Sequence, residues 1–174
     1  SPSAKLAFYV LGLVVGFAPL VEPRQAAFDV GPAAVGAVVS LGWFGTALPR
    51  LPRSYVLTRV SRRRVVVVSG LVLTGAAAVT ALSPDIRIFR IGVLAVGVAS
   101  GTYFVSAVPL IGELYPDRVG KRIGIHGTAA QLAAVAAPTV VVSVVALTTW
   151  RAVFWLLAAT ALATTAVFAA GLRR

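Results

Sequence analysis

Cysteine and methionine are both absent from this sequence of 174 residues, which also has only five acidic residues and one histidine. Without cysteine these residues can form no disulfide and no thiolate-held metal site, and a single histidine cannot form a metal cluster. We therefore expect no metal and no cofactor. Because methionine is missing even at position 1, we expect the sequence to be trimmed, processed or a piece of a longer protein.

Charge is also scarce. Charged residues make up 12% of the sequence and hydrophobic residues 59%, whereas an ordinary soluble domain has about 25% charged and about 45–50% apolar residues. The mean hydropathy is +0.93. A net charge of +11 would indicate nucleic-acid binding if the basic residues formed one face of a polar chain. Here they lie between apolar segments, so the composition predicts an integral membrane protein and no nucleic-acid partner.

Apolar runs separated by polar breakers predict six transmembrane helices, at residues 6–28, 33–57, 65–82, 88–111, 123–147 and 150–171. Each run is long enough to cross about 30 Å of hydrocarbon at about 1.5 Å per residue. The end of the first span is open, because Glu22, Pro23 and Arg24 interrupt it and the helix could stop near Leu20. We expect an all-α, polytopic membrane protein with one domain over residues 1–174.

Basic residues are distributed unequally between the two faces that six spans would create. Four lie on one face: Arg24, Arg87, Arg90 and Arg151. Twelve lie on the other: Lys5, Arg50, Arg53, Arg59, Arg62, Arg63, Arg64, Arg118, Lys121, Arg122, Arg173 and Arg174. Because cytoplasmic loops of membrane proteins are rich in lysine and arginine, we expect both termini in the cytoplasm and the protein in the cell membrane. Anionic lipid is the expected neighbour of the arginine-rich loop.

This loop also carries a family resemblance. Residues 50–66 read RLPRSYVLTRVSRRRVV, which resembles the pattern QLPxGxLxDRxGRRxxL between the second and third spans of the major facilitator superfamily. The residues in register are Leu51, Pro52, Arg59, Arg62 and Arg63, and the departures are Ser54 and Ser61 at two glycines and Thr58 at an acid. In the family this acid caps a helix end and helps to hold the cytoplasmic gate closed. Thr58 therefore weakens the latch that the resemblance implies.

The resemblance continues beyond the loop. Residues 97–125, GVASGTYFVSAVPLIGELYPDRVGKRIGI, are similar to the fourth span and following loop of the family, and WRAVF at 150–154 is similar to the opening of its sixth span. Val93 stands where the family usually has an arginine, and Arg90 lies one turn earlier. The resemblance implies a half bundle of six helices with a three-plus-three inverted repeat. It also implies a secondary active transporter that moves a small solute by alternating access as half of a twelve-helix unit, whose other half is the same chain continued or an identical copy.

Two acids are candidates for roles in such a cycle. The resemblance implies that Glu113 pairs with Arg59, Arg62 or Arg63 as an inner gate; the alternative is a surface acid among basic neighbours. Glu22 is a proton-coupling candidate if the first helix runs to Phe28, because burial would favour its protonated form. Its alternative is a solvated loop residue paired with Arg24.

A solute cavity could use Arg90, Tyr103, Gln131 and His126, which combine apolar surface with hydrogen-bonding groups. His126 has the alternative interpretation of a hydrogen-bonded side chain near the membrane interface. A second function class also stays open, namely a non-transporting membrane scaffold or regulatory subunit that keeps the packing residues but lacks coupling groups. We do not expect an enzyme, because the sequence has no paired carboxylates, histidine cluster or nucleophile with a base.

Overall fold

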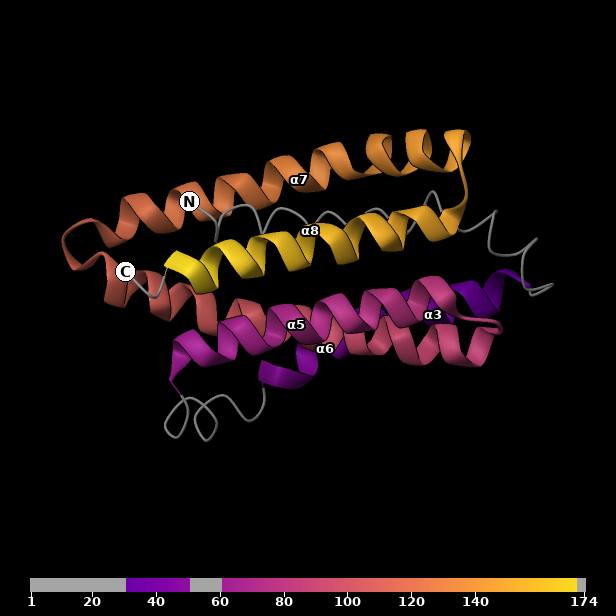
Figure 1. Cartoon of the computed structure of the whole chain (residues 1–174), viewed down its shortest axis with the longest axis horizontal. Coiled ribbons are helices and arrows are strands. Elements are labelled where there is room, and N and C mark those ends of the chain that lie inside the picture. The colour runs from indigo at the N-terminus through magenta and orange to yellow at the C-terminus, as the bar shows by residue number, and fades with distance from the viewer. Residues whose placement is uncertain (1–30, 51–60, 172–174) are drawn as a thin grey trace.

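The structure is a computed structural model, and it describes residues 31–50 and 61–171. Within these ranges every regular element is a helix, so the all-α prediction is confirmed. The elements are α3 (Pro32–Ala47), the 3₁₀ turn η2 (Leu48–Arg50), α5 (Arg62–Leu82), α6 (Ile86–Leu114), the 3₁₀ turn η3 (Pro116–Arg118), α7 (Val119–Leu147) and α8 (Trp150–Gly171). All five α-helices run along the long axis of the molecule (Figure 1).

Among the described residues, four helices are long and apolar enough to cross a membrane: α5, α6, α7 with its preceding turn, and α8. These correspond to the last four predicted spans. The second predicted span is only partly described, and its α-helix ends at Ala47 rather than continuing toward residue 57. Pro49 explains the end, because proline has no backbone N–H to donate to the preceding turn. The first predicted span, 6–28, lies outside the described residues.

The turn between α5 and α6 shows how the sequence sets a helix boundary. Asp85 takes the N-cap position of α6, and its Oδ1 accepts hydrogen bonds from the backbone N–H groups of Arg87 (2.8 Å) and Ile88 (2.9 Å). These donors have no partner within the helix, so the aspartate compensates two of them. At the other side of the turn, the Ser83 carbonyl oxygen accepts a hydrogen bond from Arg151 Nη2 at 3.2 Å, which ties α8 to the end of α5.

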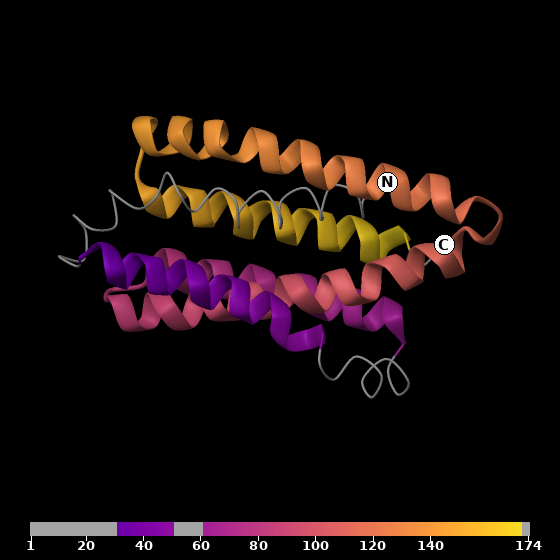
Figure 2. The same ribbon diagram turned by 180° about the vertical axis from the view of Figure 1, so that it is seen from behind.

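The helices form three levels in projection. α3, α5 and α6 pack together, α8 lies against α5, and α7 lies on the far side of α8 (Figures 1 and 2). α3 approaches α6 very closely, because a Cβ atom added to Gly97 would overlap the Gly42 carbonyl oxygen. Such contact between backbones is how helices associate in lipid, where packing replaces hydrophobic burial as the driving force.

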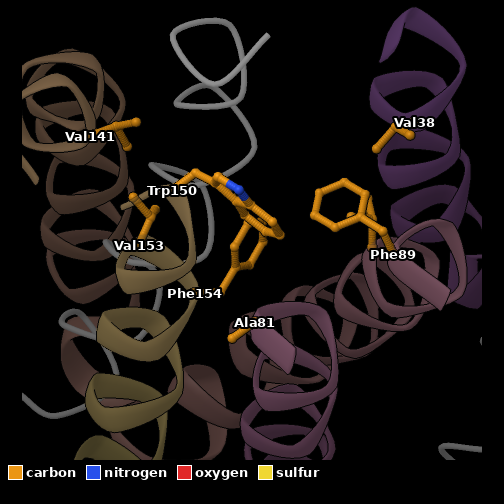
Figure 3. Packing of buried hydrophobic residues seen from close by; sticks show 8 residues of the cluster. Val38, Ala81, Phe89, Val141, Trp150, Val153 and Phe154 are labelled. Atoms are coloured by element: carbon orange, nitrogen blue, oxygen red, sulfur yellow. The ribbon is translucent and has the colours of Figure 1, made fainter. Parts of the chain in front are cut away.

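Two buried clusters mark the two ends of the bundle. At the end that holds the α5–α6 turn, hereafter the α5–α6 end, Phe89 lies edge-on to Trp150 and Phe154 at centroid distances of 5.5 and 5.7 Å (Figure 3). Toward the end that holds the α6–α7 connection, hereafter the α6–α7 end, the cluster contains Val66, Tyr103, Ala107, Leu110 and Ala130. α7 buries a small share of its 29 residues, namely His126, Ala130, Ala133 and Val141.

Candidate functional site

The α6–α7 end is strongly basic. Six cations with described side chains lie there, at the start of α5 and around the connection from α6 to α7: Arg62, Arg63, Arg64, Arg118, Lys121 and Arg122. The acids described at this end are Glu113 and Asp117. Arg63 and Arg64 are exposed and form no ion pair with any residue in the described ranges. The excess of positive charge at this end therefore remains largely unneutralised within the part of the chain that is described.

One ion pair crosses this end. Arg62 Nη1 in the first turn of α5 contacts Glu113 Oε1 in the last turn of α6, 51 positions along the chain. The two side chains are 33% and 54% exposed, and pairs this accessible to solvent contribute only about 0–1 kcal/mol to stability. Because that energy is small, the pair is suited to opening and closing rather than to holding the fold together.

A second contact fixes the connection beside the pair. The guanidinium of Arg122 lies 4.5 Å from the centre of the Tyr115 ring, so the first turns of α7 are held against the end of α6 by a cation–π contact. Ser61, a motif residue, occupies the N-cap position of α5 without a side-chain capping bond. The other motif residues, Ser54, Thr58 and Arg59, and the proton-coupling candidate Glu22 lie outside the described residues.

Tyr103 and His126 are brought together deeper in the bundle. Their ring centroids are 6.2 Å apart, and Phe104 lies 6.3 Å from the same imidazole. His126 is only 4% exposed, and neither ring nitrogen has a hydrogen-bond partner among the described residues. Among the described residues His126 is therefore buried against α6 without a hydrogen bond, while its interpretation as a hydrogen-bonded interface residue stays a prediction. It lies two turns into α7 and faces the aromatic pair of α6 rather than the membrane surface.

The remaining cavity candidates do not join this cluster. Gln131 is exposed on another face of α7. Arg90 is thirteen residues before Tyr103 on α6, about 20 Å away along the helix axis. Its Nε atom is buried and has no hydrogen-bond partner in the described part of the chain. The four cavity candidates therefore lie in three separate places: Tyr103 lies with His126, and Gln131 and Arg90 each lie apart. Phe104, which the sequence did not single out, belongs with Tyr103 and His126. Its position directly after Tyr103 in α6 was the available signal.

Comparisons with known proteins agree with the helical membrane fold described above. The family profile of the Major Facilitator Superfamily matches residues 4–174. A crystal structure of a mutant of the peptide transporter POT in complex with alafosfalin superposes with a TM-score of 0.80 over 97% of this chain, at 16% sequence identity. The chain spans 37% of that transporter's length. A search of curated proteins gives no match.

Proposed function

The chain belongs to the Major Facilitator Superfamily, and on that premise we propose that it forms part of a secondary active transporter that moves a small solute across a membrane by alternating access. The observation that carries the proposal is the Arg62–Glu113 ion pair at the basic end of a bundle whose helices are long enough to span a membrane. An exposed pair of low strength at a helix end is the kind of contact that a conformational cycle can make and break.

The charge distribution supports an orientation. We place the α6–α7 end in the cytoplasm, because it has six cations with described side chains and two described acids. The other end has three described cations, Arg87, Arg90 and Arg151, with Asp85. Six spans would then put both termini in the cytoplasm of a cell membrane. Arg63 and Arg64 are exposed at this end, where they would lie close to anionic headgroups.

A second six-helix half is the proposed partner. α7 exposes large apolar side chains along much of its length, among them Leu132 (61% exposed) and Val135 (78%), and α3 exposes Trp43 (52%). These faces are free to contact lipid or another bundle. The chain matches over about a third of a transporter's length, which is consistent with a larger unit. The mass of the complete native protein in a lipid nanodisc, compared with its denatured mass, distinguishes one long chain from two identical copies.

A charge swap tests the latch. We expect Glu113→Arg to reduce solute flux in proteoliposomes by roughly fivefold, corresponding to about 1 kcal/mol for a partly exposed pair. Adding Arg62→Glu should restore most of the flux, because the pair is re-formed with reversed charges. Arg63→Glu is the matched control, since Arg63 is exposed beside Arg62 and makes no described ion pair. A control that rescues flux equally well would refute a specific Arg62–Glu113 latch.

Proton coupling through Glu22 is part of the proposal, although Glu22 lies outside the described residues. Glu22→Gln removes the ionisable group with little change of size. We expect this variant to lose the dependence of flux on an imposed pH gradient while still exchanging solute. Unchanged dependence on the gradient would remove Glu22 from the mechanism.

The alternative of a non-transporting scaffold rests on Thr58, which replaces the acid of the family loop. Flux distinguishes the two. Proteoliposomes of the complete protein that transport no member of a panel of carboxylates, phosphates, amines and neutral sugars would favour the scaffold. No covalent chemistry is proposed, because the family match points to a transporter rather than an enzyme.

A further inference from the structure

Arg90 is a charged residue placed inside a transmembrane helix, and its Nε atom has no hydrogen-bond partner in the described part of the chain. It lies four residues after the first residue of α6, about 6 Å along the axis, within a helix that is long and apolar enough to span a membrane. The residue is only partly exposed, and its Nε atom is fully buried. Charged groups within membrane spans are costly, and those that persist generally serve a function.

The described residues next to Arg90 in the sequence offer its guanidinium little opposite charge and few hydrogen-bond acceptors. Phe89 and Val93 on the same helix are fully buried, and they pack in one cluster with Val38 of α3. The nearest acid in sequence, Asp85, already accepts hydrogen bonds from two backbone N–H groups through its Oδ1. The one ion pair found in residues 31–50 and 61–171 is at the opposite end of the bundle.

The other charges at the α5–α6 end add to the positive potential. Arg87 is exposed one turn before Arg90, and Arg151 donates to the Ser83 carbonyl oxygen while stacking over Trp150 at 4.4 Å. Three guanidinium groups and one carboxylate are therefore described at this end. The described charges at this end favour anions over cations.

We infer that Arg90 is the anchor of an anion-binding site, which takes a carboxylate or phosphate group of the transported solute. The Nε–H and an adjacent Nη–H of a guanidinium lie parallel and match the two oxygens of such a group, which a lysine cannot do. An anion would provide the acceptor that Nε–H lacks in the described part of the chain. The inference rests on the proposed transporter function and names its substrate class.

An anion at this position could also come from a lipid headgroup, so the experiment separates the two sources. The complete protein is placed in nanodiscs of phosphatidylcholine alone, and binding is measured as the shift in thermal unfolding with benzoate, phenyl phosphate, benzyl alcohol and benzylamine. The four probes share a ring and differ in charge. We expect the two anions to stabilise the protein and the alcohol and amine to have little effect.

Variants then assign the site. Arg90→Gln should weaken benzoate binding at least tenfold, about 1.4 kcal/mol, and Arg90→Lys should retain part of the affinity because it keeps the charge but not the paired donors. Arg87→Gln, which removes an exposed arginine one turn away, should leave binding unchanged. Equal binding by wild type and Arg90→Gln, or an equal loss in Arg87→Gln, would overturn the inference. If Arg90→Gln does not fold, the Arg90→Lys and Arg87→Gln comparison decides it.

Two further measurements identify the source of the bound anion. They also separate failure of this inference from failure of the proposed transporter function. If phosphatidylglycerol in the nanodisc displaces benzoate, the site is occupied by headgroups, which supports an anion site and overturns its assignment to the solute. In proteoliposomes, anion binding without flux of any solute would count against the transporter proposal alone. Flux of a neutral or cationic solute that is unaffected by Arg90→Gln would overturn the inference and leave the transporter proposal standing.

Discussion

A close approach between α3 and α6 at Gly97 leads to a prediction with a matched control. A Cβ atom added to Gly97 would overlap the carbonyl oxygen of Gly42 and lie 3.1 Å from the Cα atom of Gly45. Both obstacles are backbone atoms of a neighbouring helix, so no side-chain rotation can relieve them. By contrast, a Cβ atom added to Gly75 of α5 meets nothing within 4 Å. The same substitution, glycine to alanine, should therefore have opposite effects at two positions within transmembrane helices.

We expect Gly97→Ala to destabilise the protein by about 1–3 kcal/mol, the usual cost of forcing extra volume into a packed contact. Gly75→Ala should be neutral or stabilise by up to about 1 kcal/mol, because alanine favours the helix more than glycine does. Unfolding of the complete protein in detergent by increasing dodecyl sulfate, followed by circular dichroism, measures both variants under one condition. Equal midpoints for the two variants would refute the close contact between α3 and α6.

Two further substitutions test local features. Asp85→Ala should destabilise by about 1 kcal/mol, because the backbone N–H groups of Arg87 and Ile88 lose their acceptor; the same unfolding assay measures the loss. His126→Leu should stabilise by about 1–2 kcal/mol, since it removes two buried nitrogens without described partners, whereas Gln131→Leu on the exposed side of α7 should have little effect. A clear destabilisation by His126→Leu would mean that the imidazole has a partner outside the described residues.

The membrane spans could be predicted from hydropathy, but the helix ends could not. α5 was predicted to start at residue 65 and starts at Arg62, and α6 extends from Ile86 to Leu114 rather than from 88 to 111. Apolar composition marks the part of a helix that lies in hydrocarbon, while backbone hydrogen bonds continue into polar residues beyond it. The early end of α3 has a visible signal in Pro49. The first span lies outside the described residues and stays a prediction.

The site residues depended on packing that a sequence does not encode locally. Three arginines were candidates to meet Glu113, and the choice of Arg62 depends on how α5 crosses the end of α6. The surroundings of His126 depend on packing in the same way, because Tyr103 and Phe104, which contact its ring, belong to another helix. The resemblance to the major facilitator superfamily needed only the order and spacing of its motifs, and the family match confirms it.

The position of the ion pair limits what it can do. Arg62 and Glu113 belong to the same half bundle, so their contact cannot by itself close a path between two halves. It can hold the start of α5 at a defined place beside the end of α6. Under the proposed function, we expect the pair to act on a gate only indirectly, through the position of the start of α5.

A reversible cross-link tests whether the pair opens during transport. The 174 residues contain no cysteine, so Arg62→Cys with Glu113→Cys creates a unique pair of thiols within the chain. A short bifunctional thiol reagent with a reducible disulfide spacer would then hold the start of α5 to the end of α6. If the contact must open in each cycle, we expect flux to stop on cross-linking and to return on reduction, while each single cysteine variant is insensitive to the reagent. Flux that continues at full rate through complete cross-linking would show that the contact stays closed throughout the cycle, and the pair would then be a static brace.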